Sequence, residues 1–152
     1  MGYKERSVWA SLLILGYIWY DYFIGIFNSV TGDILNVELV NELLFNAVVM
    51  TIILEVALPI VIAIIDDKDA DYTEDERDKS ITYKATVPAY NVLYTGVILA
   101  IFYTIFPTLT TYTFPNSDLP NDYFVLNIII VFALAAEVVR FMNQIKMYRK
   151  GF

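Results

Sequence analysis

The stretch LLFNAVVMTIILEVALPIVIAII, residues 43–65, contains one charged side chain, that of Glu55. About 20 residues of α-helix are long enough to cross the ~30 Å hydrocarbon core of a bilayer. A strand of a membrane β-barrel would alternate polar and apolar residues, and this stretch does not alternate. We therefore predict that residues 43–65 form a transmembrane helix.

Three more stretches have the same character, at 7–27, 85–107 and 123–145. The whole chain is 58% hydrophobic, whereas soluble domains are roughly 45–50% apolar. We therefore predict an all-α polytopic membrane protein, with four transmembrane helices in two hairpins forming a single domain over residues 1–152. The alternative is a soluble helical bundle, which would have to keep four helices of this apolarity in water.

The basic residues predict the orientation of the chain. The loops 28–42 and 108–122 contain none of the ten Lys and Arg residues, which stand at Lys4, Arg6, Lys68, Arg77, Lys79, Lys84, Arg140, Lys146, Arg149 and Lys150. Because cytoplasmic loops of membrane proteins are enriched in Lys and Arg, both termini and the segment 66–84 are predicted to be cytoplasmic. We expect a multi-pass protein of a bacterial inner membrane, with an uncleaved first helix.

The chain contains neither Cys nor His. This composition excludes disulfides, thiolate nucleophiles, His-ligated haem, ordinary zinc sites and Ser-His triads. We accordingly expect no enzymatic activity, no cofactor and no direct binding of nucleic acid.

Glu55 is the most informative charge inside the predicted spans. A charged side chain at the bilayer centre costs about 2.5–3.5 kcal/mol on insertion scales, so such residues are candidates for function. Glu55 lies about 16 Å from the inner boundary at Asp66, and Pro59 removes the usual hydrogen-bond donor to the Glu55 carbonyl. The turn could hold a cation, a proton or a donor from a partner, or Glu55 could simply fix helix packing.

Glu137 and Arg140 are one helical turn apart in the fourth span. Glu137 is predicted at a depth similar to that of Glu55, and Arg140 can extend toward the cytoplasmic interface. Arg140 could therefore pair with Glu137, with Glu55, or with both.

Asp21 stands among the aromatic residues of YIWYDYF, residues 17–23. Aromatic residues are enriched at membrane interfaces. We therefore predict that Asp21 lies near the outer head groups, with Trp19, Tyr20 and Tyr22 in an interfacial aromatic belt. Three amides are expected to form hydrogen bonds between helices: Asn46, Asn91 and Asn127.

The acidic segment 66–84 carries a capping box formed by Thr73 and Glu76, which predicts a helix from residue 74 that runs toward the membrane. Pro88 is expected to kink this helix or to mark its entry into the membrane. A basic partner could dock on Glu74, Asp75, Glu76, Arg77 and Asp78. A weaker reading is a calcium loop with ligands at Asp67, Asp69, Asp71, Asp75 and Asp78, which lacks the turn glycine.

Two segments resemble a group of small uncharacterised bacterial membrane proteins. These proteins carry DERD-x-x-I-x-x-x-A before a span and end in a helix with A-E-x-V, then Gln, then Y-R-R-G. The matching residues are Asp75, Glu76, Arg77, Asp78, Ile81 and Ala85 in the first segment, and Ala136, Glu137, Val138, Gln144, Tyr148, Arg149 and Gly151 in the second. Lys150 replaces the second Arg of the group. The resemblance implies a bacterial inner-membrane setting and brings no activity with it.

Three functions follow from these patterns as hypotheses. The first is a regulatory or interaction protein whose acidic segment docks a cytoplasmic protein. The second is a proton- or cation-coupled transporter or channel with Glu55 at its site, which would need a homo-oligomer because four helices enclose little space. The third is a pocket for a lipid or quinone-type ligand, lined by Tyr17, Tyr90, Tyr94 and Tyr103. Membrane lipids are expected partners in every case.

Overall fold

The computed structural model describes residues 3–31, 37–65, 76–113 and 120–150, and all regular structure in these ranges is α-helical. The helices are α1 (Tyr3–Thr31), α2 (Val37–Ile65), α3 (Glu76–Ile105), α4 (Thr108–Thr113) and α5 (Asn121–Lys150). The prediction of an all-α fold is confirmed. The short helix α4 was not predicted, and it lies between α3 and α5, where the Thr110 hydroxyl donates a 2.6 Å hydrogen bond to the Asn121 side chain.

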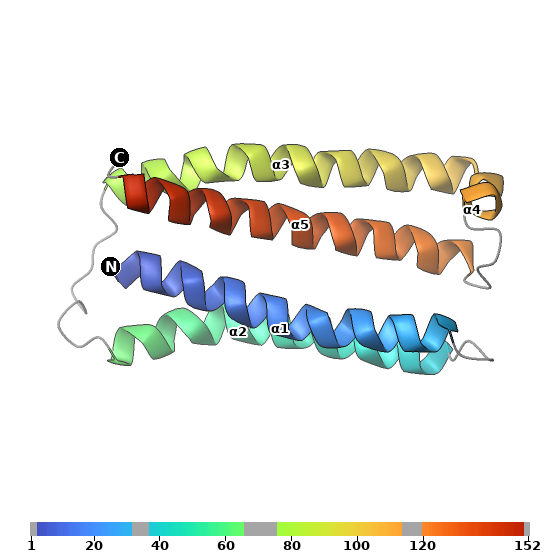
Figure 1. Ribbon diagram of the computed structural model, residues 1–152, viewed down its shortest axis with the longest axis horizontal. Coiled ribbons are helices and arrows are strands. Elements are labelled where there is room, and N and C mark those ends of the chain that lie inside the picture. The colour runs from blue at the N-terminus through green and yellow to red at the C-terminus, as the bar shows by residue number, and fades with distance from the viewer. Residues whose placement is uncertain (1–2, 32–36, 66–75, 114–119, 151–152) are drawn as a thin grey trace.

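The four long helices form two antiparallel hairpins, α1–α2 and α3–α5, which lie side by side in an elongated molecule (Figure 1). The main packing contacts run in series from α3 to α5, from α5 to α1 and from α1 to α2. The α5–α1 seam is therefore the principal link between the hairpins. The start of α1, the end of α2, the start of α3 and the end of α5 share one end of the molecule, and α4 lies at the other (Figure 1).

Three of the helices are long and apolar enough to cross a membrane, over Glu5–Asn28, Glu76–Ile105 and Asn121–Lys150. The 29-residue helix α2 contains the predicted span 43–65. Several side chains of α2, including those of Glu55 and Pro59, lie outside the described residues. Many large apolar side chains on the long helices point outward, as expected for helices whose solvent is lipid.

The α3–α5 hairpin is closely packed because α3 presents small residues to α5. The buried positions Ala85, Ala89, Gly96 and Ala100 share one face of α3. A Cβ atom built on Gly96 would lie 2.2 Å from the Cβ of Phe132 in α5, which is too close for any side chain. Small residues allow helix backbones to approach closely in membranes. Helix α3 also continues through Pro88 as a single element.

The central core lies between α1, α2 and α5. Helix α1 contributes Val8, Leu15, Trp19 and Tyr22, which pack with Ala47 of α2 and with Ile130, Phe141 and Ile145 of α5. Trp19 and Tyr22 were expected in an interfacial aromatic belt, and that expectation is wrong for both. They are buried because they occupy the face of α1 that packs against its neighbours, while Tyr20 remains exposed.

Candidate functional site

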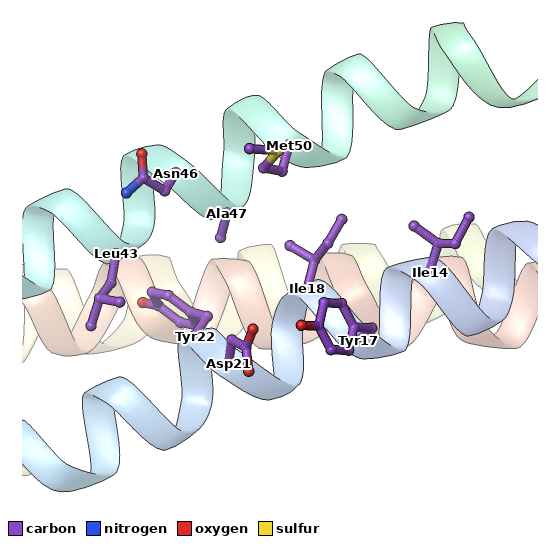
Figure 2. Close-up of a pocket in the computed structure, with 9 residues that line it drawn as sticks. All are labelled: Ile14, Tyr17, Ile18, Asp21, Tyr22, Leu43, Asn46, Ala47 and Met50. Atoms are coloured by element: carbon purple, nitrogen blue, oxygen red, sulfur yellow. The ribbon is translucent and has the colours of Figure 1, made fainter.

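A cavity of about 340 Å³ lies between α1 and α2 (Figure 2). Its lining residues are Ile14, Tyr17, Ile18, Asp21, Tyr22, Leu43, Asn46, Ala47 and Met50. Asp21 is seven residues before Asn28, where the first candidate span ends, and thus about 10 Å inside that span. The cavity therefore lies between the middle of this span and its C-terminal end.

Besides Tyr22, three polar side chains border this largely apolar cavity: Tyr17, Asp21 and Asn46. None of them makes a hydrogen bond or ion pair with any residue that the structure describes. Tyr17 and Asp21 are one turn apart on α1, and their hydroxyl and carboxylate groups point toward one another, while Asn46 comes from α2 (Figure 2). The result is an apolar space with unsatisfied hydrogen-bonding groups at its border.

This arrangement suits one kind of ligand chemistry. An ionised carboxylate only accepts hydrogen bonds, and a phenol or an amide carbonyl can also accept them. A primary ammonium offers three N–H donors and a positive charge, while the apolar walls suit an alkyl chain. The volume falls at the lower end of the range of about 300–1,000 Å³ typical of small-molecule sites.

Tyr22 forms one side of the cavity, and hydrogen bonds to α5 hold it in place. The Tyr22 hydroxyl donates to Asn127 Oδ1 over 2.9 Å, and Asn127 Nδ2 donates to the Tyr123 carbonyl over 2.8 Å. The Tyr123 hydroxyl in turn donates to Asn41 Oδ1 of α2 over 3.2 Å. Tyr22 is only 2% exposed, so its ring forms a rigid wall between the cavity and the seam.

The three predicted amides therefore behave differently. Asn127 forms the hydrogen bond between helices that was expected of it. Asn46 and Asn91 do not, because both side chains are exposed, Asn46 at the border of the cavity and Asn91 on the outward face of α3. Neither side chain hydrogen-bonds to another described residue.

Arg140 pairs with Glu137 on the same helix. Arg140 Nε donates to Glu137 Oε2 over 2.9 Å, and Arg140 Nη2 contacts the same oxygen. The guanidinium also lies 4.7 Å from the centre of the Phe141 ring. This confirms the first of the predicted pairings, and both side chains are partly buried. Glu55, the other predicted partner of Arg140, has its side chain outside the described residues.

The acidic segment lies largely outside the described residues, which begin again at Glu76. Of the five predicted docking residues, Glu76 and Arg77 are exposed, whereas Asp78 is buried on the face of α3 that packs on α5. No group of acidic side chains able to hold a metal occurs within the described parts of the chain, and the calcium candidates Asp67, Asp69, Asp71 and Asp75 lie outside them. Docking and calcium binding at this segment stay predictions.

The four tyrosines proposed to line one pocket lie apart. Tyr17 borders the cavity on α1, and α5 separates α1 from α3 (Figure 1). Tyr90 and Tyr94 stack on one another on the outward face of α3, and Tyr103 packs edge-on against Phe124 of α5. The hypothesis of a single pocket formed by all four is therefore wrong, because Tyr17 stands on α1 and the other three on α3, with α5 between these helices.

A second polar cluster, which the sequence reading missed, joins the two ends of the chain. Arg149 Nε of α5 donates to Glu5 Oε1 of α1 over 3.3 Å, and its guanidinium lies 5.5 Å from the Trp9 ring centre. Glu5 is largely buried although it is third in α1. The signal for this contact was the predicted topology, which places both chain ends on the same side of the membrane.

Comparison of the chain with protein-family models, with curated proteins and with solved structures gives no match. The likeness to bacterial membrane proteins with a DERD segment therefore stays a prediction.

Proposed function

We propose that this protein binds an amphiphile with an ammonium head group in the cleft between α1 and α2. The observation that carries the proposal is the Asp21 carboxylate, which borders an apolar cavity and has no partner among the described residues. The ammonium would lie against Asp21 and the Tyr17 hydroxyl. Its alkyl chain would occupy the space lined by Ile14, Ile18 and Met50.

The energetic reason is the cost of an unpaired charge below the membrane surface. Insertion scales put an aspartate at the centre of a membrane helix at about 2.5–3.5 kcal/mol, and the cost falls toward the interface. A cationic ligand recovers part of that cost by neutralising Asp21. Attraction between opposite charges is also stronger there than in water, because the surrounding dielectric constant is lower.

The proposal includes the membrane topology. We infer that α2 is a fourth span and that the shared end of the long helices is cytoplasmic. The support is that Arg6 and Arg77 stand near the starts of α1 and α3 and Arg149 near the end of α5. These helix ends share that end of the molecule (Figure 1), in line with the positive-inside rule. In this orientation the cleft lies toward the outer leaflet, where a ligand would enter laterally from the bilayer.

The proposal is tested with three probes that share a dodecyl chain and differ in the head group: dodecylammonium, dodecanoate and a neutral dodecyl glycoside. Equilibrium dialysis against the protein in bilayer nanodiscs measures the affinity for each. We expect dodecylammonium to bind at least tenfold more tightly than dodecanoate, a difference of about 1.4 kcal/mol.

Asp21→Asn should remove this preference while leaving the binding of the neutral probe within about twofold. The matched control is Asp122→Asn, which removes an exposed acid at the start of α5, away from the cavity. That variant should retain the preference. Equal affinity for all three head groups, or a preference lost equally in both variants, would contradict the proposed site.

A further inference from the structure

The outward face of α3 carries a polar stripe inside a membrane-spanning helix. Opposite the buried small residues lie Tyr83, Val87, Tyr90, Asn91, Tyr94 and Ile98, all of them exposed. Asn91 is six residues beyond Ala85, so it lies about 9 Å inside the predicted span. Its amide makes no side-chain hydrogen bond with the rest of the described chain.

Such an amide is poorly placed against lipid. Hydrocarbon offers neither donors nor acceptors, so polar side chains in membrane helices typically hydrogen-bond to a neighbouring helix. The neighbouring threonines show the contrast, because Thr86 and Thr95 donate to the carbonyls of Thr82 and Asn91 within α3. The hydroxyls are satisfied within the helix, whereas the Asn91 side chain has no such partner among the described residues.

We propose that this stripe is a self-association surface and that a second copy of the chain covers it, α3 against α3. Two copies with the same membrane orientation, related by a two-fold axis along the bilayer normal, place each residue of α3 at the same depth as its counterpart. An amide has both donors and an acceptor, so Asn91 of one copy complements Asn91 of the other.

The rest of α3 is compatible with this contact. Residues 85–105 include no charged side chain, so two copies meet without like-charge repulsion. Tyr90 and Tyr94 stack with their ring centres 6.2 Å apart and present broad, nearly parallel rings beside Asn91. Tyrosine hydroxyls can likewise donate and accept across a two-fold axis.

The outward face of α2 gives the opposite expectation. Its inner half exposes Ile52, Ile53, Val56, Ile60 and Val61. These side chains are satisfied by lipid and need no protein partner. The apolar face formed by these five side chains therefore gives no reason to place the contact between copies there, whereas Asn91 gives one on α3.

Cysteine cross-linking in membranes tests the proposal directly, because the chain contains no natural Cys. Val87→Cys and Tyr94→Cys each place one thiol on the stripe, seven residues apart, and Val56→Cys places one on the exposed face of α2. We expect disulfide-linked dimers from the two α3 variants and monomer from the α2 variant. Cross-linking at Val56→Cys alone, or at none of the three positions, would overturn the proposal.

The role of Asn91 is tested by association constants from energy transfer between labelled copies. Asn91→Leu should weaken dimerisation about tenfold, and Asn91→Gln should largely restore it. Thr95→Val is the matched control, since it removes an exposed hydroxyl already satisfied within the helix. Unchanged association in Asn91→Leu, or an equal loss in Thr95→Val, would refute α3 self-association through Asn91. Helical circular dichroism verifies that each variant is folded.

Discussion

The two hairpins have the same connectivity and pack in different ways. In α3–α5, small residues bring the helices together until Phe132 fills the space beside Gly96. In α1–α2, larger side chains keep part of the helices apart and a cavity remains beside Asp21. The difference shows that backbone separation in a membrane hairpin depends on the size of the facing residues, and that a larger separation can create a site.

The largest effect is expected from adding one methyl group to each of the two packed glycines. Gly96→Ala should lower the free energy of unfolding by about 2–3 kcal/mol, in the range of overpacked cores, because the new atom meets the Phe132 Cβ, which is fixed to the backbone. Gly25→Ala should cost less, because the new atom meets the flexible end of Leu43 at 2.4 Å. Denaturant titrations in micelles measure both values.

Gly16→Ala is the control for these two substitutions, since nothing lies within 4 Å of a Cβ atom at Gly16. It should be neutral or should stabilise the helix by up to about 1 kcal/mol, the difference in propensity between Gly and Ala. If Gly25→Ala destabilised as strongly as Gly96→Ala, the contrast between a tight and an open hairpin would not hold.

The next largest effect concerns the charge pair within the tight hairpin. The side chains of Arg140 and Glu137 are 28% and 37% exposed. Arg140→Met should therefore cost about 1–2 kcal/mol, between the values for exposed and buried pairs. The double variant with Glu137→Gln should recover part of this loss, because no unpaired acid remains. Additive losses in a double-mutant cycle would indicate that the two groups do not interact.

A smaller effect is expected at the end of the seam that lies toward α4 (Figure 1). Tyr22→Phe removes the hydrogen bond to Asn127, and hydrogen bonds between membrane helices contribute about 0.6 kcal/mol on average. The same titrations measure the loss, which should disappear in the background of Asn127→Leu. A loss of the same size in that background would assign the effect to packing.

The smallest effect is expected at the opposite end of the seam, where α1 begins and α5 ends. Arg149 is 60% exposed in its pair with Glu5, so Arg149→Gln should cost about 0.5 kcal/mol or less. The cost should decrease further at high salt, which screens exposed charges. Unfolding of wild type and variant at low and high ionic strength measures it, and a loss independent of salt would point to the Trp9 contact instead.

The sequence predicted the helices well because long apolar runs leave few alternatives in a bilayer. It also indicated the Glu137–Arg140 pair as one of three alternatives, since spacing within one helix determines whether two side chains can meet. It could not predict which helices touch. The cavity beside Asp21, the burial of Trp19 and Tyr22, and the separation of Tyr17 from Tyr90 all depend on the series α3, α5, α1, α2, and no local pattern encodes that order.

The burial of tryptophan on the seam has a practical consequence. The chain has two tryptophans, Trp9 and Trp19, both on α1. Trp19 lies in the core that α1 shares with α5, and Trp9 packs against that core and under Arg149. The fluorescence of these two tryptophans therefore reports on the contact between the hairpins. If the hairpins separate, the tryptophans contact water or polar head groups and their emission shifts to longer wavelength. The measurement requires no attached dye.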